Sequence, residues 1–187
     1  MKLYHASKIK GITELDPTKS TDGKLWFSSK RENVLVYLAN AVEKCWLEHG
    51  NPPKELYSKW APYGFTEDGK LRFEEYYPDA LERVYKGESG YIYAIDIDEN
   101  DVTCSPIIKN AYIMDKKVPV SSVEPIKDVY EEFKKAIAHG DISYIKYGEI
   151  SEKGQKWIEN TVKNEYNNEN IKEDYKLFLE TTFDFLK

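Results

Sequence analysis

The sequence has little cysteine, no excess of positive charge and no long apolar run. Two cysteines, Cys45 and Cys104, are too few for a disulfide framework or a zinc site, so we expect reduced thiols. The net charge of −6 does not favour nucleic acid or an anionic membrane as a partner, because both need a positive surface. No segment approaches the roughly 20 apolar residues of a membrane span, and the first residues lack the apolar core of a signal peptide. We therefore expect a soluble, cytoplasmic protein.

Several catalytic and binding motifs are also missing. The chain has no glycine-rich phosphate loop, no HExxH, no CxxC and no GxSxG, and no metal site is expected. Cys45 has the spacing of an apolar helix position, which indicates burial rather than nucleophilic activation. His49 and His139 each precede a glycine at an expected helix end, where a cationic ring interacts favourably with the helix dipole.

The composition is instead rich in aromatic residues, with 15 Tyr, 7 Phe and 4 Trp among 187 residues. Runs of β-branched and aromatic residues predict short strands, and apolar residues repeating at three and four predict helices. We expect strands at 1–7, 25–29, 90–97, 110–114 and 118–123. We expect helices at 29–49, 78–85 and 125–140, and two more after 151. This mixture predicts an α+β fold.

Two features of this pattern set the expected organisation. Ser28 or Ser29, with Glu32 three or four residues later, suits the capped start of one amphipathic helix that reaches His49. The last third of the chain is helical, whereas strands are confined to the earlier part. We therefore predict an α+β domain at 1–125 and a helical extension at 126–187 that packs on it and does not fold independently.

His5 is the most informative single residue. It ends a short strand, between Tyr4 and Ser7, immediately before a loop. An imidazole beside a hydroxyl group can present donors and acceptors to a ribose-like diol. The alternative is a structural role, in which the ring of His5 satisfies a nearby backbone carbonyl.

The order of the neighbouring segments adds a resemblance. Leu3-Tyr-His-Ala-Ser7 resembles the first-strand motif of the ADP-ribosyltransferase superfamily, in which the His and the hydroxyl residue hold the nicotinamide and ribose region of NAD. Gly23-Lys-Leu-Trp-Phe-Ser-Ser29, followed by a helix with Asn33 and Tyr37, resembles the second motif. In the poly(ADP-ribose) polymerase branch that motif has a Tyr that stacks on nicotinamide, and Trp26 stands in its place. An indole face can stack on a pyridinium with about 0.5–2 kcal/mol of cation–π attraction.

The third motif departs from the family pattern. Asn110-Ala-Tyr-Ile-Met114 resembles the strand read as Asn-Glu-Tyr-Ile, but Ala111 stands where the branch has its catalytic Glu. That Glu binds the ribose 2′-hydroxyl and stabilises an oxocarbenium-like transition state, which a methyl group cannot do. The three motifs fall within residues 1–125 and leave the helical tail uncovered.

The resemblance implies a split, mostly antiparallel sheet flanking an NAD-sized cleft. The residues expected to bind NAD, as substrate or ligand, are His5, Ala6, Ser7, Trp26, Phe27, Ser28, Tyr37 and Ala111. If the protein is an active transferase or NAD glycohydrolase, His5 would take part and another carboxylate, Glu124 or Glu75, would replace the missing one. A second hypothesis is a non-catalytic relative that binds NAD or ADP-ribose. A third is a protein-interaction domain that uses the aromatic segment 57–77 and the helical tail.

Overall fold

The computed structural model describes all residues, 1–187, and confirms a mixed α+β fold. The chain forms two compact units that are not continuous in sequence. The first comprises Met1–Leu38, Gly64–Arg72 and Tyr85–Ser143, and the second comprises Ala39–Tyr63, Phe73–Val84 and Tyr144–Lys187. The structure therefore divides the chain differently from the expected boundary at residue 125. None of the helices is both long and apolar enough to cross a membrane.

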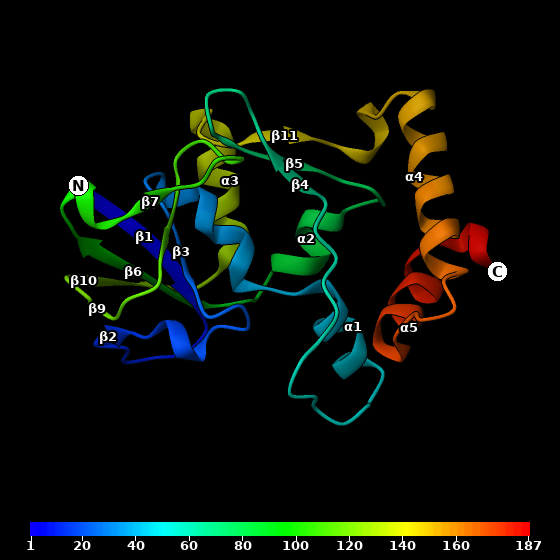
Figure 1. The fold of residues 1–187 in the computed structure, drawn as a ribbon. Coiled ribbons are helices and arrows are strands. Elements are labelled where there is room, and N and C mark those ends of the chain that lie inside the picture. The colour runs from blue at the N-terminus through cyan, green and yellow to red at the C-terminus, as the bar shows by residue number, and fades with distance from the viewer. The chain divides into compact units, whose positions relative to one another are not determined.

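The first unit is built on a six-stranded sheet in the order β10-β6-β1-β3-β8-β7, and all its recorded strand pairs are antiparallel. Its strands, several of which lie side by side in Figure 1, are β1 (Lys2–Ser7), β3 (Leu25–Ser28), β6 (Gly90–Asp96), β7 (Thr103–Cys104), β8 (Ala111–Met114) and β10 (Ser122–Ile126). The three strands that carry the family-like motifs, β1, β3 and β8, are consecutive neighbours. Segments far apart in the chain thus meet at the centre of one sheet.

The sheet is nearly split between β1 and β3. Strand β1 pairs with β6 along its whole length, but with β3 only through Tyr4 and Ser28. Strand β3 in turn pairs with β8 at all four of its residues. The sheet therefore consists of two well-paired halves that one residue pair joins.

Each face of this sheet has its own apolar cover. On one face a core of Leu3, Leu25, Phe27, Ile95 and Met114 also contains Leu15 and Val118. The last two belong to the two-stranded sheet of β2 (Glu14–Leu15) and β9 (Val118–Pro119). The short 3₁₀ helix η1 (Pro17–Lys19) follows β2 in the chain. The other face is covered by the 3₁₀ helix η2 (Arg31–Leu38), and α3 (Val129–His139) packs against η2. A further 3₁₀ helix, η3 (Glu99–Asp101), precedes β7.

The second unit is mainly helical. It contains α1 (Ala41–Glu48), most of α2 (Ala80–Tyr85), α4 (Glu152–Tyr166), α5 (Glu173–Thr182) and the 3₁₀ helices η4 (Tyr147–Glu149) and η5 (Asp184–Leu186). Strands β4 (Tyr63–Phe65), β5 (Leu71–Glu74) and β11 (Ser143–Ile145) form a three-stranded sheet, and the division between the units falls within each of them.

Aromatic rings fill the core of the second unit. The ring of Trp60 lies 5.5 Å from those of Phe178 and Phe183, and the ring of Tyr77 lies 5.7 Å from that of Phe183. Phe73 and Tyr77 are buried. Trp60, Phe73 and Tyr77 of the aromatic segment 57–77 therefore contribute to internal packing.

Two expected elements are each divided in the structure. The predicted helix at 29–49 is η2 followed by α1, because the Asn40 side chain accepts a hydrogen bond from Val42 N–H and starts a new helix. The Ser28 hydroxyl accepts from Lys30 N–H and does not form the expected capping box. The predicted strand at 118–123 is β9 and β10, which belong to different sheets. Strands β4, β5 and β11 were not expected.

Candidate functional site

The first unit has a small pocket on the face of the sheet that η2 covers. Five of the predicted site residues line it: Trp26, Phe27 and Ser28 from β3, Tyr37 from η2 and Ala111 from β8. Asn33, Val34, Phe65 and Ile108 complete the lining. The strand register explains this grouping, because Ser28 lies directly opposite Ala111, and residues opposite one another in an antiparallel pair share a face.

Trp26 and Tyr37 give the pocket two exposed aromatic rings. Their exposed fractions are 40% and 50%, which is unusual for large rings next to a core. The indole N–H of Trp26 donates to an Asp22 carboxylate oxygen at 2.8 Å, and this bond fixes the edge of the ring. The same bond, with one from the Ser20 hydroxyl, lowers the pKa of Asp22 below its ordinary value. An anchored ring with an accessible face is suited to stacking on a planar ligand.

Asn33 holds one wall of the pocket in place. Its buried side-chain amide donates to the Gly69 carbonyl and accepts from Leu71 N–H, both at 2.9 Å. These bonds attach the turn at 66–70 to η2, and Phe65 precedes that turn. Gly69 has φ +75°, and a Cβ there would lie 2.3 Å from the side-chain nitrogen of Asn110. The turn is therefore both conformationally restricted and closely packed.

His5 does not line this pocket. Tyr4 pairs with Ser28, so His5 falls opposite Phe27 and on the same face, whereas Trp26 points to the other face. The ring centroids of His5 and Phe27 are 5.9 Å apart, in agreement with this register. The structure therefore separates the imidazole from the indole that it was expected to join.

The ring of His5 instead satisfies a backbone carbonyl. Its Nδ1 lies 3.0 Å from the carbonyl oxygen of Trp26, at the place where β1 and β3 separate. A carbonyl oxygen only accepts, so Nδ1 carries the hydrogen. Burial lowers the pKa of His5 below its ordinary value, and the hydrogen bond to Trp26 offsets part of this effect. This geometry corresponds to the structural role considered for His5.

Ala6 and Ser7 also lie outside the pocket lining. Ala6 is buried within β1 and pairs with Ile92 of β6. The Ser7 hydroxyl accepts a hydrogen bond from Ile9 N–H at 3.1 Å and so shapes the turn after the strand. The first-strand motif therefore contributes none of its three predicted ligand-binding side chains to this pocket.

Neither replacement carboxylate lies at the pocket. Glu124 is on β10, with β6 and β1 between it and β3, which is roughly 14 Å at the usual strand spacing. Its two oxygens accept from Arg31 Nε and Nη2 at 2.8 and 2.5 Å. Glu75 belongs to the second unit, where it is buried and accepts from Leu81 N–H and Tyr147 N–H. Both carboxylates have structural partners, and no residue that lines the pocket is acidic.

The pocket is too small to enclose a nucleotide. Its volume is about 30 Å³, whereas sites that enclose drug-sized ligands measure about 300–1,000 Å³. It could hold a water molecule or a substituent such as a carboxamide. The NAD-sized cleft that the resemblance implies is therefore not found around these residues, and a ring would rest across the mouth between Trp26 and Tyr37.

Sequence reasoning missed four of the lining residues. Asn33 and Val34 lie on η2, four and three residues before Tyr37. Residues at that spacing share a helix face, so the helical periodicity could have identified both. Phe65 and Ile108 come from loops or a short strand distant in sequence, and nothing local marks them.

No family model matches this chain, and no match to a curated protein or a solved structure reaches significance. The resemblance to ADP-ribosyltransferases thus rests on the three short motifs and on the positions of their strands.

Proposed function

We propose that the first unit binds the planar heterocycle of a nicotinamide or adenine nucleotide, such as NAD or ADP-ribose, and does not cleave the glycosidic bond. The observation that carries this proposal is the meeting of Trp26, Tyr37, Ser28 and Ala111 around one pocket. All four positions belong to the second and third family-like motifs. The protein would then be an ADP-ribosyltransferase-like binding protein.

The aromatic pair supplies most of the binding energy in this proposal. The ligand ring stacks on the exposed indole face of Trp26, with the ring of Tyr37 at the other side of the mouth. A positively charged pyridinium gains cation–π attraction in addition to the apolar contact. A neutral adenine base gains the apolar contact and stacking alone.

Ser28 is the polar group suited to a carboxamide. Its hydroxyl oxygen accepts from Lys30 N–H at 3.0 Å, which leaves the hydroxyl hydrogen to donate to a ligand carbonyl. The pocket of about 30 Å³ suits a substituent of this size. A nicotinamide ring would thus insert its carboxamide and leave the pyridinium between the two aromatic rings.

The chemistry of cleavage is not provided at this site. Loss of nicotinamide develops positive charge on the ribose, which a nearby carboxylate would stabilise. Ala111 occupies the position of that carboxylate in the family-like motif, and Glu124 is held by Arg31. Binding without turnover is therefore favoured over transferase or NAD glycohydrolase activity.

Calorimetric titration tests the binding step. NAD, ADP-ribose and nicotinamide are titrated separately into the protein, and at least one should bind. Trp26→Ala should weaken the binding of NAD by about 2- to 30-fold, the range of a lost cation–π contact, and Trp26→Tyr should retain most of it. Val123→Ala, at an exposed apolar position on β10, is the control and should bind as the parent does. Failure of all three ligands to bind at millimolar concentration would end the proposal.

A gain of function tests the catalytic step. Ala111→Glu places a carboxylate beside Ser28, and Ala111→Gln places a neutral group of the same shape there. Release of nicotinamide from NAD is measured by chromatography. We expect none from the parent protein or the Gln variant, and detectable release from the Glu variant. Turnover by the parent protein would show an active enzyme and contradict the non-catalytic reading.

A further inference from the structure

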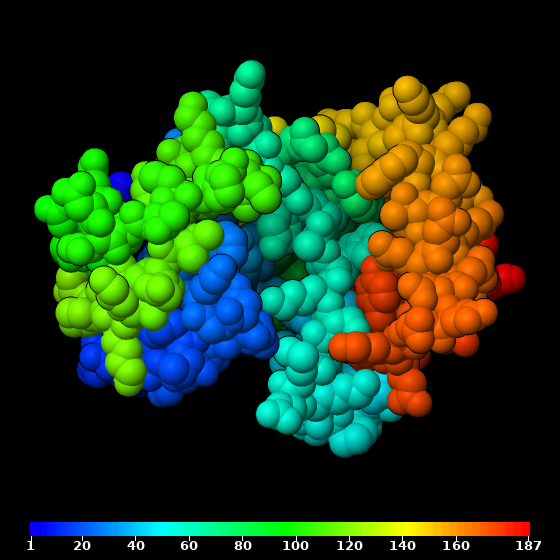
Figure 2. Space-filling model, viewed as in Figure 1, coloured from blue at the N-terminus to red at the C-terminus, as the bar shows by residue number.

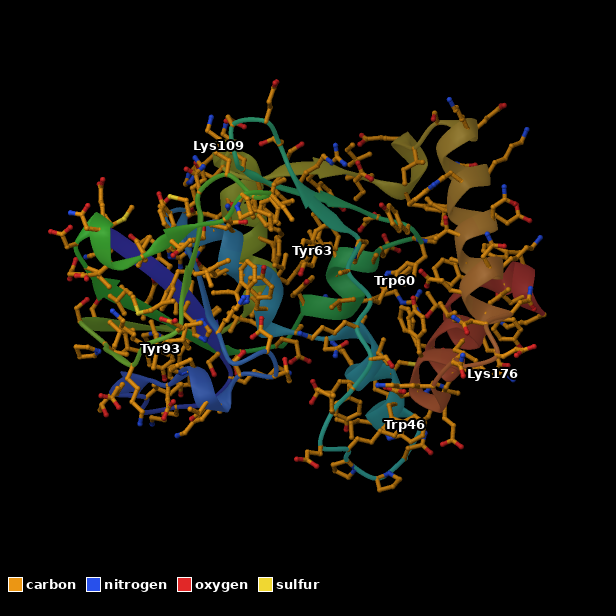
Figure 3. All side chains as sticks on the ribbon, viewed as in Figure 1. Trp46, Trp60, Tyr63, Tyr93, Lys109 and Lys176 are labelled. Carbon is orange, nitrogen blue, oxygen red and sulfur yellow. The ribbon has the colours of Figure 1, made fainter.

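The second unit has a larger pocket whose walls are mainly aromatic. Its volume is about 230 Å³, and Trp60, Tyr76, Trp157 and Tyr175 line it. Lys59, Ala61, Ile158, Thr161 and Glu165 complete the lining. Figure 3 labels Trp60, which belongs to the loop between α1 and β4. All these residues belong to the second unit.

Two of the neighbouring ring pairs in this pocket are nearly perpendicular. Trp60 and Tyr76 are 6.0 Å apart between centroids with planes at 83°, and Tyr76 and Trp157 are 5.8 Å apart at 77°. Tyr175 lies 6.4 Å from Trp60 at 41°. Rings that only fill a core also pack edge to face, but here they surround an open volume. Aromatic rings that line one space are suited to a cation, because the face of each ring is electron-rich.

Helix α4 presents three of the lining residues in a row. Trp157, Thr161 and Glu165 are spaced by four, so they lie one above another on the same helix face. The Trp157 ring is 55% exposed, although that face of the helix also carries the buried Ile158 and Val162. In the space-filling view the orange atoms of α4 lie at the surface beside the red atoms of α5 (Figure 2). Trp157 therefore lies on the solvent-exposed side of the pocket.

The polar groups of the pocket also point to a ligand. Glu165 supplies a carboxylate, which accepts a hydrogen bond from the Tyr175 hydroxyl. The indole N–H of Trp60 is buried and has no hydrogen-bond acceptor. A buried donor without a partner is rare and costly in a folded protein. The site thus offers rings and a negative charge to a cation, and one donor to an acceptor atom.

We propose that this pocket binds a small molecule with a methylated ammonium group and an acceptor oxygen, as in choline or glycine betaine. The ammonium group lies against the faces of Trp60, Tyr76 and Trp157, with the Glu165 carboxylate nearby. The acceptor oxygen takes the hydrogen bond from the Trp60 indole N–H. This inference is independent of nucleotide binding by the first unit, and either can fail without the other.

The Tyr175 hydroxyl is a lasting hydrogen-bond donor at this site. Burial and the hydrogen bond to Glu165 raise the pKa of Tyr175 far above its ordinary value, so the hydroxyl stays protonated. It therefore continues to donate to Glu165 and orients the carboxylate for the ligand.

Nuclear magnetic resonance of the four tryptophan indole N–H groups gives a direct test, with each signal assigned by a Trp→Phe variant. Titration with choline or glycine betaine should shift the indole signals of Trp60 and Trp157 and leave that of Trp26 unchanged. The neutral isostere of choline, 3,3-dimethylbutan-1-ol, should cause at least tenfold weaker shifts. No shift at roughly 10 mM choline, tenfold above a Kd of 1 mM, would overturn the proposal. Equal shifts with the neutral isostere would also overturn it.

Variants separate the three contributions. Trp157→Ala should weaken choline binding by about 2- to 30-fold, and Trp157→Phe by less. Glu165→Gln keeps the shape and should weaken choline but not the neutral isostere. Leu56→Ala, at an exposed apolar position outside the pocket, is the control and should bind choline as the parent does.

The donor of Trp60 has its own readout. Trp60→Phe removes the N–H and keeps an aromatic ring, so it should weaken betaine and choline more than tetramethylammonium, which has no acceptor atom. If the three ligands weaken equally, the role assigned to this donor is wrong. Far-ultraviolet circular dichroism of each variant establishes that it is folded.

Discussion

Replacement of Asn33 by alanine is the most direct perturbation of the wall of the pocket in the first unit. The side chain is 2% exposed, and both of its backbone partners, Gly69 and Leu71, are buried. Alanine would leave a buried carbonyl and a buried N–H without partners. Each such loss costs about 1–3 kcal/mol, and we expect about 2–4 kcal/mol in total after local relaxation. That is a large part of the 5–15 kcal/mol typical of a folded domain.

Urea unfolding followed by circular dichroism measures this loss. Asn100→Ala is the matched control, because Asn100 is exposed and its side chain bonds only to Asp98, the residue before η3. We expect the control to lie within about 0.5 kcal/mol of the parent protein. Hydrogen exchange adds a local readout: Asn33→Ala should speed amide exchange in residues 66–71, which η2 then no longer holds. A loss as small as that of the control would refute the assignment of Asn33 as the anchor of this turn.

Three further predictions concern charged groups. Because burial lowers the pKa of His5, the unfolded chain takes up a proton first as the pH falls below about 6.5. Stability should therefore decrease below that pH, and this slope should be smaller in His5→Gln, as measured by thermal unfolding against pH. The Asp16 carboxylate pairs with Lys117, which lowers the pKa of Asp16 to about 2. The contribution of this pair to stability is present above pH 4 and is lost as the pH falls through about 2. The free energy of unfolding of Asp16→Asn should therefore depend less on pH over that interval. Glu124→Gln should leave NAD affinity unchanged and lower the free energy of unfolding by less than about 1 kcal/mol, because the carboxylate is half exposed; a large loss of NAD binding in calorimetry would show that Glu124 does take part in the site.

Elements with a strong local signal were predicted well. Strand β6 is dense in β-branched and aromatic residues, and α3 ends at Gly140, which has φ +79° as a left-handed cap requires. The helix at 29–49 was predicted as one element because its apolar spacing continues across Asn40. Only the cap at Asn40, a feature of three-dimensional structure, divides it.

The candidate site was predicted in part, for a similar reason. The motif strands are neighbours, and Trp26, Ser28, Tyr37 and Ala111 meet, because local sequence defines strands and alternation assigns side chains to faces. The direction of His5 depends on its register with a strand about twenty residues later, which no local pattern specifies. The aromatic pocket of the second unit joins a loop to two distant helices, and it was not predicted.

The alternation of the two units along the chain has a consequence for biosynthesis. The ring of Trp60 finds its packing partners, Phe178 and Phe183, more than a hundred residues later in the chain. Strands β1, β3 and β6 are complete long before that, so the sheet can assemble while residues 39–63 and 73–84 still await α4 and α5. Contacts so distant in sequence form slowly. Until α4 and α5 are synthesised, the aromatic side chains of residues 39–63 and 73–84 stay exposed, and chaperones would have to shield them. Shortened chains that stop before α5 should accordingly leave these rings exposed and aggregate.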